Sequence, residues 1–240
     1  MLHRALEAAL RKNAIGRNVA DLVDAPSVPD RETPAFTFAQ ARALLAACES
    51  DRFGAFYIVA LMTGLRLGEL LSLRWEDVDW IRAELHVRRS IARVPGVGWV
   101  EQPPKSKQSR RSAALTPLAV RFLERHQLLQ RAAIAAAGDA WEDNNLVFPN
   151  SVGRTYEPQN VYRRSWYPLL VRAGLPRIRI HDLRHTFATL MREEGADLKT
   201  TSEALGHSQI GITADLYTHN VPLALREAVE RLEKRLLDRN

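Results

Sequence analysis

The chain has 240 residues, of which 46% are hydrophobic, so it can bury one large core with a small appendage. Lys and Arg outnumber Asp and Glu by 34 to 28, and the net charge of +6 makes nucleic acid the first partner to consider. A single cysteine, Cys48, excludes an internal disulfide framework, and no apolar run is long enough for a bilayer, so we expect a cytoplasmic protein without a membrane segment or signal peptide.

The N-terminal part is predicted to be a helix followed by a linker. Apolar residues recur at helical spacing within residues 2–15, and Gly16 ends the pattern. Residues 24–34 contain three prolines and several charges, which indicates an exposed segment. One helix cannot form a domain, so we expect it either to dock on the main body or to be the remainder of a domain that this chain lacks.

The main body is predicted to open with two helices. The first is capped by Thr37, with Gln40 at the third position completing a capping box. The second, over residues 53–73, is mostly apolar and therefore expected to be buried, yet it contains Arg66 between two glycines. A buried guanidinium costs free energy unless it meets an anion. The alternative is a salt bridge to Glu69, one helical turn away.

A strand pattern follows a turn at residues 75–80. We expect three short strands in one small antiparallel sheet, over residues 84–94, 98–104 and 110–117. The polar loop between the second and third strands places Lys105 and Lys107 at the tip of a hairpin. Loop lysines are ordinarily just solvated, so this placement alone indicates no function.

Helical sequence returns after the strands. A long helix is predicted from Thr116 to Ala137, with Pro117 at its first position. Another is predicted over residues 157–174, and further helices are expected from His181 onward, at 198–206, at 208–219 and at 222–240. The last helix has an apolar stripe formed by Leu225, Val229, Leu232 and Leu236.

Chemically useful side chains are concentrated between His181 and His219. If His181 begins a helix, Arg184 and His185 lie with it on one polar face, opposite an apolar face. The spacing of His181 and His185 suits a zinc pair, but the glutamate of such a motif is lacking and a third ligand is unclear. We therefore expect no metal site.

Several residues together meet the needs of phosphodiester exchange. Two arginines, Arg66 and Arg184, can hold both non-bridging oxygens of a phosphodiester. A phenol such as that of Tyr217 has a pKa of about 10, so it needs an imidazole to take its proton and guanidinium groups to favour the phenolate. Its attack would give a phosphotyrosine ester, and a lysine from a hairpin tip can protonate the leaving oxygen.

Five motifs occur in order along the chain. They are Thr-Gly-Leu-Arg-x-Gly-Glu-Leu at 63–70, Pro-Lys-Ser-Lys-x-Ser-Arg-Arg at 104–111, His-Asp-Leu-Arg-His-Thr-Phe-Ala-Thr at 181–189, Leu-Gly-His-Ser at 205–208 and Leu-Tyr-Thr-His at 216–219. From about Thr37 to its end, the chain resembles the catalytic domain of the tyrosine recombinases, the phage integrase family.

The resemblance implies a fold and a division into parts. The fold would be mainly α with a small three-stranded antiparallel sheet (α+β), with residues 37–240 as the catalytic domain. Residues 24–36 would be an interdomain linker. Residues 1–23 resemble only the last helix of the family's core DNA-binding domain, so we expect that domain to be truncated, which affects DNA affinity and site specificity.

The resemblance also implies a phosphate-binding set. Arg66 and Arg184 would clamp the scissile phosphate, and His207 would hydrogen-bond to it. Glu69 would support the first arginine, and His185 is expected to be structural. No cofactor, metal or ATP is implied.

The remaining implied roles concern proton transfer and attack. Tyr217 would be the nucleophile that leaves a 3′-phosphotyrosyl DNA end, and His181 would assist proton transfer. Lys105 would protonate the leaving 5′ oxygen, with Lys107 as the alternative because hairpin length varies.

The resemblance implies double-stranded DNA as the partner and a homo-tetramer on paired DNA sites, with a monomer in the absence of DNA as the alternative and with possible accessory directionality factors. The C-terminal helix would then pack on a neighbouring protomer, or it would fold back on its own chain. The predicted function is an integrase-type site-specific recombinase of cytoplasmic, bacterial or phage origin. The alternatives are a truncated DNA-binding fragment without recombination activity and a relaxing activity like that of type IB topoisomerases.

Overall fold

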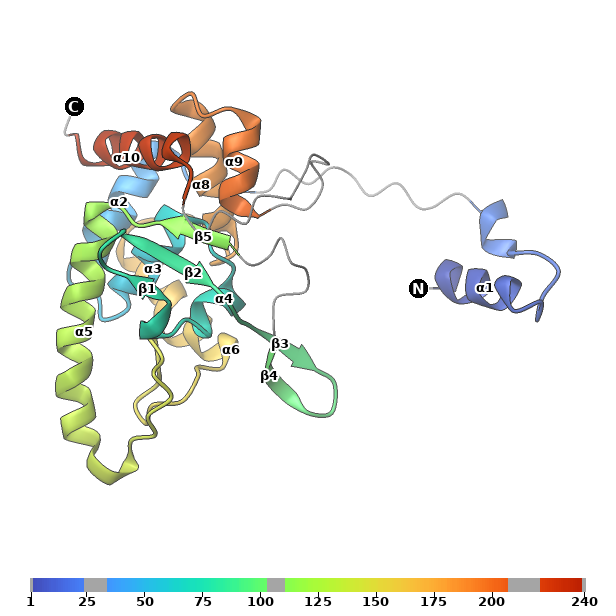
Figure 1. The fold of residues 1–240 in the computed structure, drawn as a ribbon, viewed down its shortest axis with the longest axis horizontal. Coiled ribbons are helices and arrows are strands. Elements are labelled where there is room, and N and C mark those ends of the chain that lie inside the picture. The colour runs from blue at the N-terminus through green and yellow to red at the C-terminus, as the bar shows by residue number, and fades with distance from the viewer. Residues whose placement is uncertain (1, 24–33, 103–110, 207–220, 239–240) are drawn as a thin grey trace. The chain divides into compact units, whose positions relative to one another are not determined.

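The computed structural model describes residues 2–23, 34–102, 111–206 and 221–238. The chain divides into two compact units, Met1–Glu32 and Thr33–Asn240 (Figure 1). The smaller unit contains α1 (Leu2–Arg11) and a 3-10 helix (Val19–Leu22). The first helix ends earlier than the predicted residue 15.

The larger unit consists mainly of helices around one apolar core. The α-helices in its described part are α2 (Phe38–Cys48), α3 (Gly54–Thr63), α4 (Leu67–Leu71), α5 (Pro117–Ala137), α6 (Pro158–Val161), α7 (Tyr167–Arg172), α8 (Asp182–Glu193), α9 (Leu198–Leu205) and α10 (Leu223–Leu237). Short 3-10 helices (Trp75–Asp77 and Gly138–Ala140) and a π-helix (Tyr162–Trp166) complete the helical elements. The predicted helix over 157–174 is therefore built from α6, the π-helix and α7.

The helix at the centre of this core is α3, every residue of which is buried. It packs against α2, α5 and α8. The prediction of one helix over residues 53–73 was wrong, because Gly64 adopts a left-handed backbone with φ of +61° and ends α3. A new helix, α4, then begins after Arg66, whose backbone is extended. The break places Arg66 at a helix N-terminus instead of inside a buried helix.

In the described part of the chain, strands form two small antiparallel sheets. The three-stranded sheet has the order β1–β2–β5, and its members are β1 (Val78–Asp79), β2 (Glu84–Val87) and β5 (Arg111–Ala114). In the β2–β5 pair, Glu84 lies opposite Ala114, and Val87 lies opposite Arg111. The second sheet is a hairpin of β3 (Ser90–Val94) and β4 (Gly98–Gln102), which Figure 1 shows extending from the body.

The expected three-stranded antiparallel sheet is thus present, but its strands were partly misassigned. The segment predicted as a single strand over 84–94 is split between the two sheets. The split occurs next to Arg89, which donates to Asp77 at 2.8 Å and also contacts Glu76. These ion pairs hold Arg89 against the 3-10 helix Trp75–Asp77, at the point where the chain passes from the first sheet to the second. Part of the predicted turn at 75–80 forms β1.

Local capping signals were read correctly. The Thr37 hydroxyl accepts from the Gln40 backbone N–H at 3.3 Å, and the Gln40 side chain accepts from the Thr37 N–H at 3.0 Å. The Thr116 hydroxyl accepts from the Ala119 N–H at 3.2 Å, with Pro117 in the first turn of α5. Both caps satisfy backbone donors that a helix leaves unpaired at its start.

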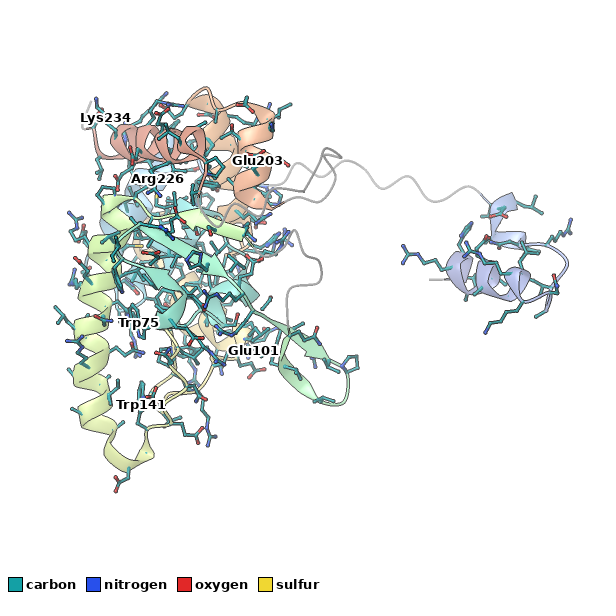
Figure 2. The ribbon with its side chains drawn as sticks, in the orientation of Figure 1. Trp75, Glu101, Trp141, Glu203, Arg226 and Lys234 are labelled. Atoms are coloured by element: carbon teal, nitrogen blue, oxygen red, sulfur yellow. The ribbon has the colours of Figure 1, made fainter. Side chains whose placement is uncertain are left out.

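The C-terminal helix α10 folds back on its own chain. Its predicted apolar stripe is buried, with Leu225, Val229, Leu232 and Leu236 each at most 3% exposed. The helix packs against α2, α8, α9 and β5. Figure 2 labels Arg226 on α10, which donates to the Glu84 carboxylate of β2 at 2.8 Å. None of the helices in the described ranges combines the length and the apolar character needed to cross a membrane.

Candidate functional site

Three of the six predicted site residues lie in the described part of the chain, namely Arg66, His181 and Arg184. Lys105, its alternative Lys107, His207 and Tyr217 lie outside the described residues, so their predicted roles stay predictions.

Arg66 is held at the N-terminus of α4 by Glu69. The Arg66 backbone N–H donates to Glu69 Oε2 at 2.8 Å, and Arg66 Nη1 donates to Oε1 at 2.9 Å. The salt bridge that the spacing of these residues suggested is therefore present. The Arg66 side chain is nevertheless 39% exposed, whereas that of Glu69 is 5% exposed. The guanidinium is anchored at one end and still reaches solvent.

A further arginine, Arg111, completes this ion-pair cluster, and sequence reasoning missed it. It is the first residue of β5, and its side chain is 7% exposed. Arg111 Nη1 and Nη2 donate to Glu69 Oε1 and Oε2 at 3.2 and 2.9 Å, a two-pronged pair. Its Nε donates to the Ala204 carbonyl at 3.3 Å, near the end of α9. No alternation of burial along β5 signals it, because Ala113 and Ala114 are both buried.

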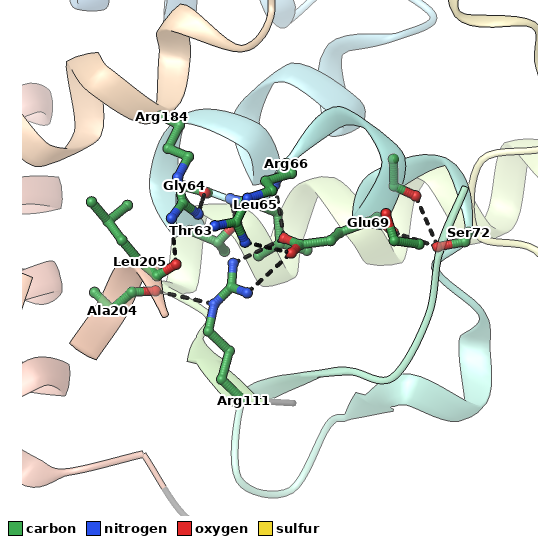
Figure 3. Close-up of polar contacts among 12 residues, drawn as sticks. Thr63, Gly64, Leu65, Arg66, Glu69, Ser72, Arg111, Arg184, Ala204 and Leu205 are labelled. Atoms are coloured by element: carbon green, nitrogen blue, oxygen red, sulfur yellow. Dashed lines mark hydrogen bonds and ion pairs between the residues drawn. The ribbon is translucent and has the colours of Figure 1, made fainter. Parts of the chain in front are cut away.

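Arg184 enters the cluster from α8 and is only 4% exposed. It donates through Nη1 to the Gly64 carbonyl at 2.8 Å and through Nη2 to the Leu205 carbonyl. Figure 3 shows Arg66 and Arg111 at the Glu69 carboxylate, and Arg184 beside them at the two backbone carbonyls that it binds. The side of α8 predicted to be polar is thus only partly exposed, since Arg184 is buried whereas His185 is exposed.

The cluster carries more positive than negative charge. Burial raises the pKa of Glu69, but the neighbouring Arg111 and Arg66 outweigh this effect and hold it below its usual range, so the carboxylate is ionised. Burial, together with Arg66 and Arg111, lowers the pKa of Arg184 to about 9, which leaves it a cation at neutral pH. Three guanidinium groups and one carboxylate leave two positive charges uncompensated within the cluster. Such a place suits an anion.

His181 lies directly before α8 and is half-buried. Burial lowers its pKa, and the nearby His185, Arg184 and Arg179 lower it further. The imidazole is therefore neutral near pH 7 and can accept a proton. His185 is exposed, and its ring meets that of His181 edge to face with centroids 5.6 Å apart. Within the described ranges, no group of three His, Cys, Asp or Glu side chains could hold a metal ion.

Comparison with known proteins adds independent evidence. Residues 34–223 match the sequence profile of the phage integrase family. The chain is 36% identical over 222 residues to a tyrosine recombinase XerC-like protein of Caldanaerobacter subterraneus, an overlap that covers 86% of this chain and 56% of the relative. It is 33% identical over 237 residues to an integrase of Streptomyces ambofaciens, with 92% and 58% covered. The chain thus spans a little more than half the length of these relatives.

Solved structures show the same fold. The Tn1549 transposon integrase in complex with transposon right end DNA superposes with a TM-score of 0.69 at 23% identity, covering 96% of this chain and 78% of that one. The XerA recombinase superposes with a TM-score of 0.58 at 23% identity, covering 88% and 65%. The predicted fold class, mainly α with a small antiparallel sheet, is confirmed.

Proposed function

The chain belongs to the phage integrase family, and we propose that it is the catalytic part of a site-specific DNA recombinase of the integrase type. The observation that carries the proposal is the convergence of Arg66 and Arg184, from α4 and α8, on a cluster with two uncompensated positive charges. In this proposal residues 37–240 form the catalytic domain, 24–36 the linker and 1–23 the end of a DNA-binding domain.

The arginine cluster is suited to a phosphodiester. Arg66 is over a third exposed and anchored by Glu69, so it can bind one non-bridging oxygen without losing its position. Arg184 adds a charge that water screens little because the side chain is buried. Together with His207, these groups would neutralise the charge that repels a nucleophile and stabilise the charge that develops during attack.

The proposed reaction is an exchange of esters. The phenol oxygen of Tyr217 attacks the phosphorus, a 3′-phosphotyrosyl bond forms, and the bond from phosphorus to the 5′ oxygen breaks. His181, which is neutral near pH 7, takes the phenol proton, and Lys105 or Lys107 gives a proton to the leaving 5′ oxygen. Attack by a 5′ hydroxyl reverses these steps and rejoins the strand. The bond energy is conserved in the ester, so we propose that neither ATP nor a metal is required.

The proposed partner is double-stranded DNA. The net charge of +6 fits a polyanion, and the structural neighbour with the TM-score of 0.69 is itself a complex with DNA. We further propose that a homo-tetramer assembles on paired sites in the cytoplasm, with accessory directionality factors. In the described structure the C-terminal stripe is already covered by its own chain, so the assembly would need other surfaces or an exchange of α10.

The test is covalent capture of DNA. The full chain is incubated with nicked duplexes made from the DNA that flanks its coding sequence, and a denaturation-resistant protein–DNA adduct is expected. Tyr217→Phe should abolish the adduct while leaving the unfolding temperature unchanged. An adduct formed by that variant would refute the nucleophile. DNA binding without any adduct would favour the non-recombining fragment, and relaxation of plasmid DNA without a defined site would favour the topoisomerase-like activity.

A further inference from the structure

Arg111 connects β5, α4 and α9, three elements that the proposed catalytic residues do not join to one another. From the start of β5 it reaches Glu69 on α4 with two donors and the Ala204 carbonyl at the end of α9 with a third. Its side chain is 7% exposed, so water competes little for these bonds. A guanidinium is the one side chain whose planar fork can serve a carboxylate and a carbonyl at once.

The Glu69 carboxylate is shared equally between two arginines. Oε1 accepts from Arg66 Nη1 and Arg111 Nη1, and Oε2 accepts from the Arg66 backbone N–H and Arg111 Nη2. Because Arg111 binds both oxygens, it opposes rotation of the carboxylate that anchors Arg66. The Glu69 side chain is only 5% exposed, so its charge needs a partner. Without Arg111, that partner would be Arg66, whose guanidinium would be drawn towards Glu69 and away from solvent.

The end of α9 is held by two arginines at consecutive carbonyls. Arg111 binds the Ala204 carbonyl and Arg184 binds the Leu205 carbonyl, both at a helix C-terminus that favours cations. Gly206 follows with φ of +63°, and a Cβ built there would lie 2.8 Å from Arg111 Cδ. The Arg111 side chain therefore runs directly against the backbone, and a larger residue at position 206 would have to displace it.

From these contacts we propose that Arg111 is a positioning residue for phosphate binding, acting on Arg66 through Glu69 and on the end of α9 through the Ala204 carbonyl. It does not touch the substrate. The inference deepens the proposed function and rests on it, since the anion is taken to be the phosphate of DNA.

The experiment measures the affinity of the full chain for inorganic phosphate from its thermal unfolding at constant ionic strength. Arg111→Met should weaken phosphate binding about tenfold. Arg111→Lys keeps the charge but cannot form the fork, so it should recover only part of the affinity. In a Glu69→Gln background, Arg111→Met should change the affinity by less than about threefold, because the shared carboxylate is gone. Arg121→Met is the matched control, since Arg121 of α5 forms an exposed ion pair with Glu49 and takes no part in the cluster.

Full recovery by Arg111→Lys would show that Arg111 acts only as a charge, and it would overturn the proposal. An unchanged phosphate affinity in a destabilised Arg111→Met chain would show a purely structural role, with the same consequence. If Arg111→Met does not fold, Arg111→Gln and Arg111→Lys carry the comparison. The adduct assay separates the two proposals. If Arg111→Met weakens phosphate binding but the unsubstituted chain forms no adduct, positioning is supported and the proposed reaction is refuted. If Arg111→Met binds phosphate as tightly as the unsubstituted chain and the unsubstituted chain forms the adduct, the reaction is supported and positioning is refuted.

Discussion

Glu84 is a buried carboxylate in β2 that holds the chain at the start of its C-terminal helix. It is 2% exposed, and its Oε1 accepts from the Val221 backbone N–H at 3.1 Å and from Arg226 at 2.8 Å. Replacing Glu84 with Ala removes the charge-assisted bond from Arg226 and leaves the Val221 N–H without this acceptor. Each effect should lower the free energy of unfolding by about 1–3 kcal/mol. Breaking a buried pair on one side alone costs about 3–5 kcal/mol. Arg226 is partly exposed and can recover water, so we expect a loss of about 3 kcal/mol.

The loss is measured as the shift of the urea midpoint at an unchanged slope. Glu230→Ala is the control, because Glu230 is exposed on the same helix and its removal should change stability by no more than about 0.5 kcal/mol. Arg226→Met tests the pair itself, since the double variant should be less destabilised than the sum of the two single variants. A loss below about 1 kcal/mol for Glu84→Ala, or strict additivity with Arg226→Met, would show that this contact does not anchor α10.

Three further outcomes are expected. Gly64→Ala should cost about 2–3 kcal/mol in urea unfolding, because φ is +61° and a Cβ would lie 2.8 Å from atoms of Leu205 and Phe187; an unchanged midpoint would contradict this. Arg184→Gln should weaken phosphate binding and lower stability by about 2–4 kcal/mol, since it deprives two buried carbonyls of their donor, and retained affinity would exclude a role in anion binding. Burial lowers the pKa of His126, so below about pH 6.5 the unfolded chain binds more protons than the folded chain. The free energy of unfolding should therefore decrease as the pH is lowered, by up to about 1.4 kcal/mol per pH unit. Urea titrations between about pH 5.5 and 7.5 should show a shallower fall for His126→Gln, and an equal slope would refute the assignment.

Local features of the structure could be predicted because their causes are local. The Thr37 and Thr116 caps depend on residues three positions away, and the pair of Arg66 with Glu69 depends on the same spacing. The left-handed turn at Gly64 could not be read from hydrophobicity, because the apolar pattern continues on both sides of it. The division of the strand predicted over 84–94 depends on ion pairs that its hydrophobic pattern does not reveal.

Arg111 shows the same limit within the site itself. It lies 42 residues from Glu69 and 93 residues from Ala204, so no local pattern links it to either of them. In the sequence it reads as one more basic residue in a polar, lysine-containing motif, a class that is usually solvated. Its burial follows from the β2–β5 pairing, which brings the start of β5 beside α4 and the end of α9. Residues proposed to bind a substrate can therefore be picked out by type and motif, whereas those that hold them in place depend on the tertiary fold.

The choice of partners explains how a buried cluster keeps its positive charge. Glu69 serves both Arg66 and Arg111, whereas Arg184 is held by the neutral carbonyls of Gly64 and Leu205. A carbonyl satisfies a guanidinium donor without cancelling its charge, so Arg184 is fixed in place and still attracts an anion. A second carboxylate at that position would stabilise the empty site and weaken binding of a phosphate. The single carboxylate and the two carbonyls thus hold the cluster in place while leaving it the positive charge that the proposed phosphate site requires.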